Sequence, residues 1–171
     1  AQAGIGRSFQ RTNVLREMTV FENVRLAAAA PGFGHRRWLA RAEREAAPLT
    51  AARAALDRVG LAATGVAGAL SHGQLRLLEI AMALATAPAV LLLDEPLAGM
   101  GPEEGERLAA LLRELASDHA LLLIEHDMDV VFAVADTLTV MVDGRVLERG
   151  PPARIRASAA VRDAYLGHEA A

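Results

Sequence analysis

The clearest pattern of hydrophobic and polar positions runs through residues 70–100. It begins with a polar, glycine-containing turn, continues with apolar residues at helical spacing, and ends in the unbroken apolar run of residues 90–93. Such a run is too short for a helix and predicts a central parallel strand that is covered on both faces. Asp94 and Glu95 then fall at the carboxyl end of this strand, and Pro96 ends it because proline has no N–H for a ladder.

Two places in this stretch suit phosphate and metal chemistry. Ligands bind at the carboxyl edge of open α/β sheets, so Asp94 and Glu95 could hold a metal ion there and orient a water. Ser71 is predicted to cap the following helix, with Gly73 and Gln74 in its first turn, where unpaired N–H groups can hold a phosphate. Taken alone, an apolar strand that ends in Asp-Glu is also compatible with a solvated strand end.

The rest of the chain predicts further helices and strands. Thr19 and Glu22 form a capping-box pattern that begins one helix. Residues 38–58 predict another, with a break or kink at Pro48 and an end at Gly60. The downstream pattern predicts a helix from Pro102 to Leu115, a strand at 121–124, a helix at 130–135, a strand at 138–142, a hairpin turn at Asp143-Gly144 and two short final helices.

Composition narrows the class of protein. The 171 residues suit one domain, and the lack of cysteine removes disulfide and thiol chemistry, which is consistent with the cytosol. The longest apolar stretch, residues 80–93, is broken by Thr86 and Pro88 and is shorter than the ~20 residues that a bilayer requires. Residues 1–10 lack the pattern of a signal peptide. A net charge of −3 argues against nucleic acid as a partner.

All 18 basic residues are arginine, and the sequence contains no lysine. A phosphate-cradling P-loop of the form G-x-x-x-x-G-K-S/T needs a lysine to reach the β and γ phosphates. Gly4 and Gly6 are only a glycine pair and cannot replace it. We therefore expect no P-loop within this chain.

The segment LSHGQ, followed by RLLEIAMALATAPAVLLLDEP, resembles the signature motif, helix and Walker B strand of an ATP-binding-cassette (ABC) ATPase. The resemblance covers nearly the whole chain. The segments MTVFENV, LAGM and VRDAYLG resemble the ATP-binding subunits of branched-chain amino-acid importers. The implied fold is α/β, the C-terminal part of a P-loop (ABC-type) ATPase domain truncated before its Walker A segment, with a parallel-sheet core and an all-helical subdomain.

The resemblance also implies how this single partial domain, residues 1–171, is organised. The expected parts are a strand and Q-loop (1–19), a helical subdomain with the signature motif (20–88), a catalytic core (89–150) and C-terminal helices (151–171).

The family pattern assigns a role to each candidate site residue. Asp94 would act on Mg²⁺, and Glu95 would be the general base for the water that attacks the γ-phosphate of ATP. His126 matches the switch histidine that contacts the γ-phosphate, because imidazole can donate a hydrogen bond near neutral pH. Gln10 matches the Q-loop glutamine near the metal and the attacking water, although GRSFQ alone also fits a surface glutamine at a strand end.

The signature turn is expected to contact ATP held by a partner subunit through Ser71, Gly73 and Gln74. His72, within the same cofactor-binding group, replaces the usual first glycine of the family, and we expect its side chain to point away from the phosphate. Gly101 stands where the family commonly has an aspartate, which puts a polar contact across a dimer in doubt.

The function implied by the resemblance is ATP hydrolysis that powers import of branched-chain amino acids, with ATP and Mg²⁺ as cofactors. The expected partners are a second ABC ATPase subunit, head to tail, and transmembrane permease subunits that contact the Q-loop and helical subdomain. This places the protein in the cytoplasm, peripheral on the inner face of the plasma membrane. The alternative is a non-hydrolytic interaction module that cannot bind ATP alone because Walker A is missing, and we expect the bare chain to be inactive. A DNA-repair or chromosome-structure ATPase would carry long heptad arrays, which the sequence lacks.

Overall fold

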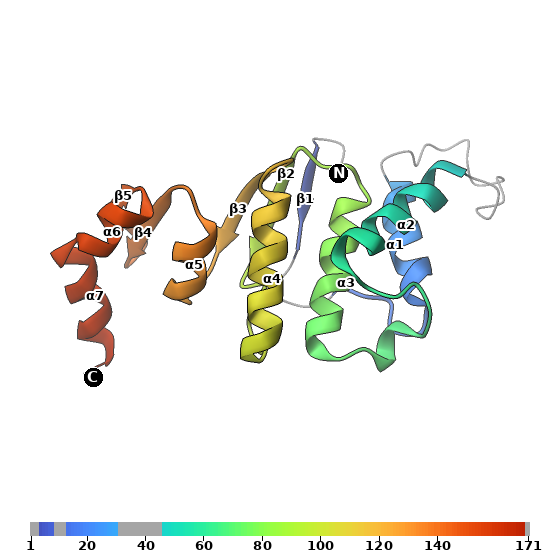
Figure 1. The fold of residues 1–171 in the computed structure, drawn as a ribbon, viewed down its shortest axis with the longest axis horizontal. Helices are drawn as coiled ribbons and strands as arrows, with labels where there is room; N and C mark the ends of the chain where they lie inside the picture. The colour runs from blue at the N-terminus through green and yellow to red at the C-terminus, as the bar shows by residue number, and fades with distance from the viewer. Residues whose placement is uncertain (1–3, 9–12, 31–45, 170–171) are drawn as a thin grey trace. The chain divides into compact units, whose positions relative to one another are not determined.

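The computed structural model describes residues 4–8, 13–30 and 46–169, and it divides into two compact units, Ala1–Glu125 and His126–Ala171 (Figure 1). The first unit contains β1 (Ile5–Arg7), α1 (Val20–Ala29), α2 (Ala46–Val59), a short 3-10 helix η4 (Ala67–Ala69), α3 (His72–Leu84), β2 (Val90–Asp94), α4 (Pro102–Leu115) and β3 (Ala120–Ile124). The second contains α5 (Met128–Val134), β4 (Leu138–Val142), β5 (Arg145–Gly150), α6 (Pro152–Ala157) and α7 (Ala159–Glu169). Within the described ranges, no helix is long and apolar enough to cross a membrane.

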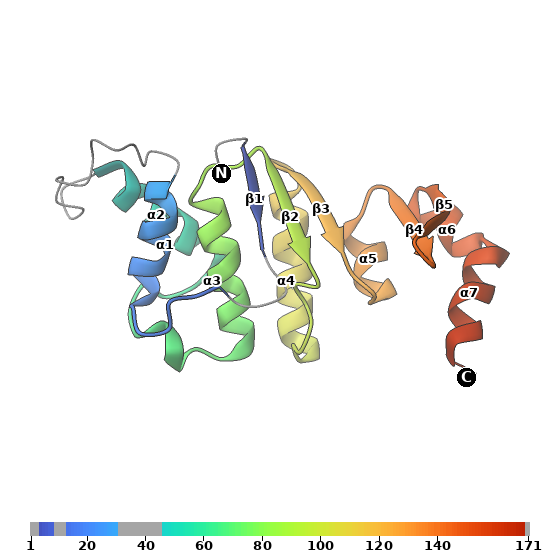
Figure 2. The same cartoon turned by 180° about the vertical axis from the view of Figure 1, so that it is seen from behind.

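A three-stranded parallel sheet in the order β1-β2-β3 forms the centre of the first unit. Figures 1 and 2 show α4 on one face of this sheet, and α3 packs against β1. Leu91 and Leu93 are buried on the helix side, whereas Leu122, in register with Leu92, is 57% exposed on the other side. The predicted central parallel strand is confirmed. Its predicted burial on both faces is met in part: Leu91 and Leu93 are buried and Val90 and Leu92 on the other face are half-buried, whereas the exposed positions belong to the neighbouring strand β3.

The helices of the first unit begin and end largely where local sequence predicts. The Thr19 hydroxyl accepts from the Glu22 N–H at 3.2 Å, and the Thr19 N–H donates to the Glu22 carboxylate at 3.0 Å, which confirms the capping box. The Glu22 carboxylate accepts hydrogen bonds from the Thr19 N–H and from the Thr19 hydroxyl, and these two bonds lower the pKa of Glu22. At the end of α2, Gly60 has φ +67° and the Leu61 N–H donates to the Leu56 carbonyl, which forms a Schellman motif.

The described helix α2 continues unbroken from Ala46 to Val59, whereas the stretch before Ala46 lies outside the described residues, so the predicted break or kink at Pro48 stays a prediction. Pro48 is the third residue of this helix. A proline removes the hydrogen bond to the residue four positions earlier, and that residue precedes Ala46. The missing N–H therefore removes no bond within the described helix.

The second unit is a hairpin packed against helices. Strands β4 and β5 pair antiparallel, and Asp143 and Gly144 between them both have positive φ, at 51° and 73°. Two successive left-handed residues form the turn that matches the twist of a hairpin, so the prediction at Asp143-Gly144 is confirmed. The core of this unit consists of Val131, Leu138, Val140, Ile155 and Val161.

Leu91 and Leu122 offer a matched pair for testing the two faces of the sheet. We expect Leu91→Ala to lower the free energy of unfolding by about 2–5 kcal/mol, because it leaves a cavity. We expect Leu122→Ala to cost less than about 1 kcal/mol, because that side chain is largely exposed. Urea unfolding followed by circular dichroism measures both. Equal losses would show that the open face is covered in solution.

Candidate functional site

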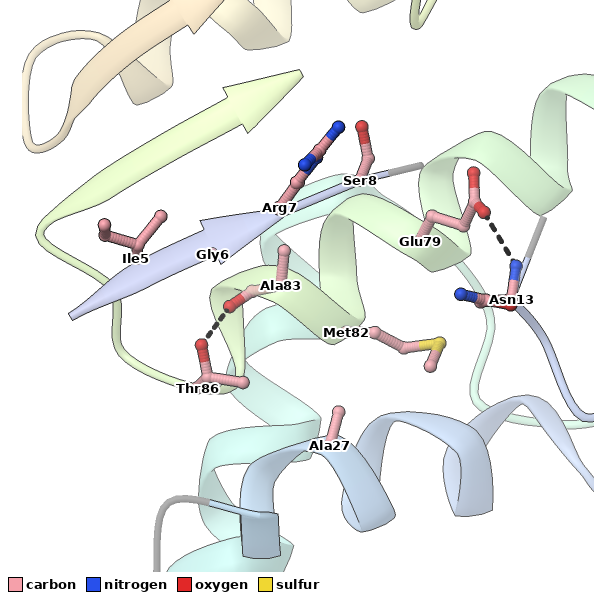
Figure 3. Close-up of a pocket in the computed structure, with 10 residues that line it drawn as sticks. All are labelled: Ile5, Gly6, Arg7, Ser8, Asn13, Ala27, Glu79, Met82, Ala83 and Thr86. Atoms are coloured by element: carbon pink, nitrogen blue, oxygen red, sulfur yellow. Dashed lines mark hydrogen bonds between the residues drawn. The ribbon is translucent and has the colours of Figure 1, made fainter. Parts of the chain in front are cut away.

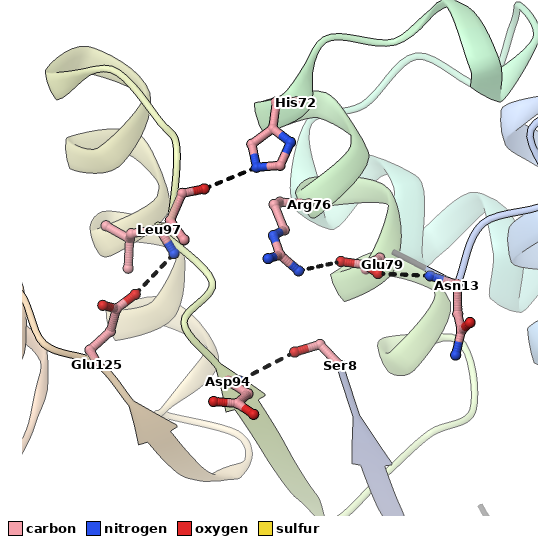
Figure 4. A network of polar contacts seen from close by, with 9 residues as sticks. Ser8, Asn13, His72, Arg76, Glu79, Asp94, Leu97 and Glu125 are labelled. Atoms are coloured by element: carbon pink, nitrogen blue, oxygen red, sulfur yellow. Dashed lines mark hydrogen bonds and ion pairs between the residues drawn. The ribbon is translucent and has the colours of Figure 1, made fainter. Parts of the chain in front are cut away.

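The two acids lie at the carboxyl edge of the parallel sheet, as the sequence pattern predicts. Asp94 is the last residue of β2, and its N–H lies 3.5 Å from the hydroxyl of Ser8, a buried residue just after β1 (Figure 4). Glu95 follows with φ +45°, and its N–H donates to the Ile124 carbonyl at 2.9 Å. A residue with a Cβ rarely adopts this left-handed conformation, and such strain collects at functional sites. Ala87 and Asp143 share this conformation, so the strained backbone supports Glu95 as a candidate together with its place at the sheet edge.

The predicted signature turn forms the start of α3. The Ser71 hydroxyl accepts from the Gln74 N–H at 3.2 Å, and the Ser71 N–H donates to the Gln74 side-chain oxygen at 3.0 Å. Ser71, His72 and Gln74 are exposed, whereas Gly73 is buried. A Cβ at Gly73 would lie 2.9 Å from the carboxylate of Glu104 in α4, so the end of the Glu104 side chain lies directly against this glycine. The turn therefore presents three of its four residues to a ligand or partner.

The His72 side chain reaches the turn that follows the acids. Its Nε2 lies 3.0 Å from the Ala98 carbonyl oxygen (Figure 4), and because a carbonyl only accepts, Nε2 is the donor. Gly99, with φ +76°, lies directly against the ring. The structure thus joins the signature turn and the acid-bearing turn through a side chain that the family pattern does not require.

Glu125 holds the other side of the same turn. Its carboxylate accepts from the Leu97 N–H at 3.0 Å (Figure 4). Sequence analysis missed this contact. The available signal was a polar residue directly after the apolar run 121–124, at the same sheet edge as Asp94.

A buried ion pair lies on the inward side of α3. Arg76 and Glu79 are joined at 2.9 Å, with side chains only 6% and 5% exposed. The Asn13 N–H donates to the other Glu79 oxygen at 3.1 Å (Figure 4). Sequence analysis missed the pair, although two charges at i and i+3 among the buried Leu75, Leu78 and Ile80 were a readable signal. This pair fixes the segment at Asn13 to the signature helix.

Two pockets flank α3. The first, of about 300 Å³, lies beside β1 and combines an apolar wall of Ile5, Ala27 and Met82 with the polar groups of Asn13 and Glu79 (Figure 3). The second, of about 730 Å³, opens beside the signature turn; its lining includes Ser71, Gly73, Gln74, Arg58, Glu104 and Arg107. Arg58 is ion-paired with Glu114 and Asp118, and the hydrogen bond from Arg58 lowers the pKa of the Asp118 carboxyl.

Two further predicted site residues, Gln10 and His126, stay predictions. Gln10 lies outside the described residues. His126 is exposed and is the first residue of the second unit. Within the ranges that the structure describes, no three His, Cys, Asp or Glu side chains group as metal ligands.

The buried pair of α3 is expected to be sensitive to the loss of one partner. We expect Glu79→Leu to lower the free energy of unfolding by about 3–5 kcal/mol, because it leaves the buried Arg76 guanidinium without this carboxylate. The double variant Arg76→Met with Glu79→Leu should recover most of the loss. Urea unfolding measures each variant.

The matched control is Glu103→Leu in the exposed Glu103–Arg107 pair of α4, whose side chains are 89% and 78% exposed. That change is expected to alter stability by less than about 1 kcal/mol. A double variant no more stable than Glu79→Leu would contradict the assigned role of the pair.

Comparison with known proteins agrees with this geometry. A family model described as "ABC transporter" matches residues 1–98, and one described as "Branched-chain amino acid ATP-binding cassette transporter" matches residues 145–171. The high-affinity branched-chain amino acid transport ATP-binding protein BraF of Pseudomonas aeruginosa is 39% identical over 178 residues, which cover 98% of this chain and 69% of that protein.

Solved structures of ABC cassettes are also similar to this chain. The ADP conformation of MJ1267, an ATP-binding cassette of an ABC transporter, is 32% identical with a TM-score of 0.78, over 96% of this chain and 68% of that one. The dimeric, post-hydrolysis structure of the cassette MJ0796 bound to ADP and Pi is 26% identical with a TM-score of 0.71, over 88% and 64% of the two chains. The α/β fold predicted from the sequence is therefore shared with ABC cassettes.

Proposed function

The chain belongs to the ABC transporter family of ATP-binding proteins, and we propose that it serves as the subunit that hydrolyses ATP to power import of branched-chain amino acids. The similarity to BraF, over 98% of this chain, supports the class of substrate. The match of residues 145–171 to the branched-chain amino-acid family model supports it independently.

The observation that carries the proposal is that the turn carrying Asp94 and Glu95 contacts the signature turn within one compact unit. Asp94 would hold Mg²⁺, which typically takes one or two carboxylates together with phosphate oxygens. The hard oxygen donors of Asp94, Glu95 and Ser8 at one sheet edge fit this requirement. When bound, Mg²⁺ neutralises charge on the phosphates of ATP.

Glu95 would act as the general base that accepts a proton from the attacking water. Its backbone N–H is bonded to the Ile124 carbonyl and its φ is +45°, so the residue is held directly after the end of β2. His126 would donate to the γ-phosphate, and Gln10 would contact the metal and the water. Both assignments remain predictions from the family pattern.

A second copy or related subunit would complete the site. The exposed Ser71 and Gln74 at the start of α3 suit contact with ATP held by a head-to-tail partner, because helix starts bind anions. The similarity to a dimeric cassette supports this arrangement. Permease subunits would contact the Q-loop and the helical subdomain, residues 20–88, at the inner face of the membrane.

The lack of lysine favours a second candidate function for the 171 residues by themselves. Without a P-loop lysine, the chain would serve as an interaction module that offers its signature turn to an intact partner and binds no ATP alone. The acids at the end of β2 favour the ATP-hydrolysing subunit, and the lack of lysine favours the interaction module. One experiment separates them.

We expect the bare chain to release no phosphate from Mg·ATP and a form with a family-like P-loop segment joined before Ala1 to hydrolyse it. In that form, Glu95→Gln is expected to lower kcat by about 100-fold or more, because it removes the general base. A phosphate-release assay with isothermal titration of Mg·ATP measures both steps.

Glu103→Gln is the matched control, because Glu103 is an exposed acid on the following helix α4. Its kcat should stay within about two-fold of the parent form. Hydrolysis by the bare chain would contradict the need for a lysine, and an active Glu95→Gln form would contradict the role of Glu95.

A further inference from the structure

We propose that His72 is a positioning residue that fixes the turn carrying Glu95 to the first turn of the signature helix within the same chain. The inference deepens the proposed function and rests on it, since the two turns matter for ATP hydrolysis only if that function holds. The geometry that supports it belongs entirely to the first unit.

The contact between the two turns is specific. His72 is the first residue of α3, and its Nε2–H donates to the Ala98 carbonyl at 3.0 Å. A Cβ at Gly99 would lie 3.1 Å from the ring atoms Cδ2 and Nε2, closer than ordinary packing allows. With φ +76°, Gly99 also has a backbone conformation that favours glycine. The lack of a side chain at Gly99 therefore leaves room for the His72 ring, and glycine also suits the backbone conformation at this position.

The turn is also tied to Glu95 and to the end of β3. The Ala98 N–H donates to the Glu95 carbonyl at 3.2 Å, and the Leu97 N–H donates to the Glu125 carboxylate at 3.0 Å. Glu125 thus binds Leu97 and His72 binds Ala98, and these two residues are neighbours in the chain. The bond from His72 joins α3 to this turn, so it restrains where Glu95 lies relative to Ser71 and Gln74.

A glycine at position 72 would have no side chain to make this bond. A phenylalanine would keep a ring against Gly99 but would lose the donor, and a glutamine would keep a donor. These three substitutions separate the hydrogen bond from the packing of the ring.

Amide hydrogen exchange on the full chain tests the contact directly. In His72→Phe and His72→Gly, the amides of Ala98 and Met100 are expected to exchange about five-fold faster, the effect of losing about one net hydrogen bond. In His72→Gln they should stay within about two-fold of the parent chain. Amides in the centre of β2 should not change. Unchanged exchange at Ala98 and Met100 in His72→Phe overturns the proposal.

The P-loop form provides a readout that a purely structural role would not change. His72→Phe is expected to lower kcat for phosphate release about five-fold with KM for ATP within about two-fold, and His72→Gln should restore kcat. A raised KM with unchanged kcat overturns the proposal, because His72 would then act on ATP binding alone. If the P-loop form with His72 intact hydrolyses no ATP, the proposed function fails, and the exchange measurement decides the positioning role.

A double-mutant cycle between positions 72 and 99 supplies an independent test. Gly99→Ala should accelerate exchange at Ala98 more in the parent chain than in the His72→Gly chain, where no ring opposes the new methyl group. Gly60→Ala is the matched control, because Gly60 has φ +67° but nothing within 4 Å of an added Cβ. Additive effects of His72→Gly and Gly99→Ala overturn the proposal.

Discussion

The parallel pairing of β2 with both of its neighbours is the constraint on which the site depends. Because parallel strands share a direction, pairing in register brings the ends of all three strands to one edge of the sheet. Asp94 therefore lies beside Ser8 on one side and in register with Ile124 on the other. Glu125, which directly follows Ile124, therefore lies within reach of the turn after β2. Residues from three distant segments meet because one strand is central.

The signature helix is attached to this sheet by charge as well as by apolar packing. Burying Arg76 and Glu79 removes both from water, a cost that their mutual contact and the bond from Asn13 offset. An apolar contact would allow α3 to slide, whereas a hydrogen-bonded ion pair has a defined geometry. At its other end, α3 is attached through His72 to the turn after the acids. The helix thus connects the segment at Asn13 to the acid-bearing turn.

Backbone conformation at the acid-bearing turn is set by two residues of different kinds. Glu95 occupies the left-handed region in spite of its Cβ, so surrounding contacts must hold it there. Gly99 occupies the same region without strain and leaves room for the His72 ring. The turn is held by hydrogen bonds from both sides, which suits the role proposed for Glu95.

The sequence by itself determined those elements that depend on interactions between residues close together in the chain. The capping boxes at Thr19 and Ser71, the helix end at Gly60, the hairpin turn at Asp143-Gly144 and the strand before Asp94 each depend on residues within a few positions of one another, so their types and spacing suffice. The family motifs added the expected ABC fold, because they combine several such elements in one order.

Only the tertiary structure decided the contacts between distant residues. The bond from His72 to Ala98 spans 26 positions, that from Leu97 to Glu125 spans 28, and that from Asn13 to Glu79 spans 66. No periodicity encodes such pairs, since each depends on how the strands and helices pack. The same reason explains the exposed Leu122: apolar composition predicts a strand that tends to be buried, but only packing decides which face is covered.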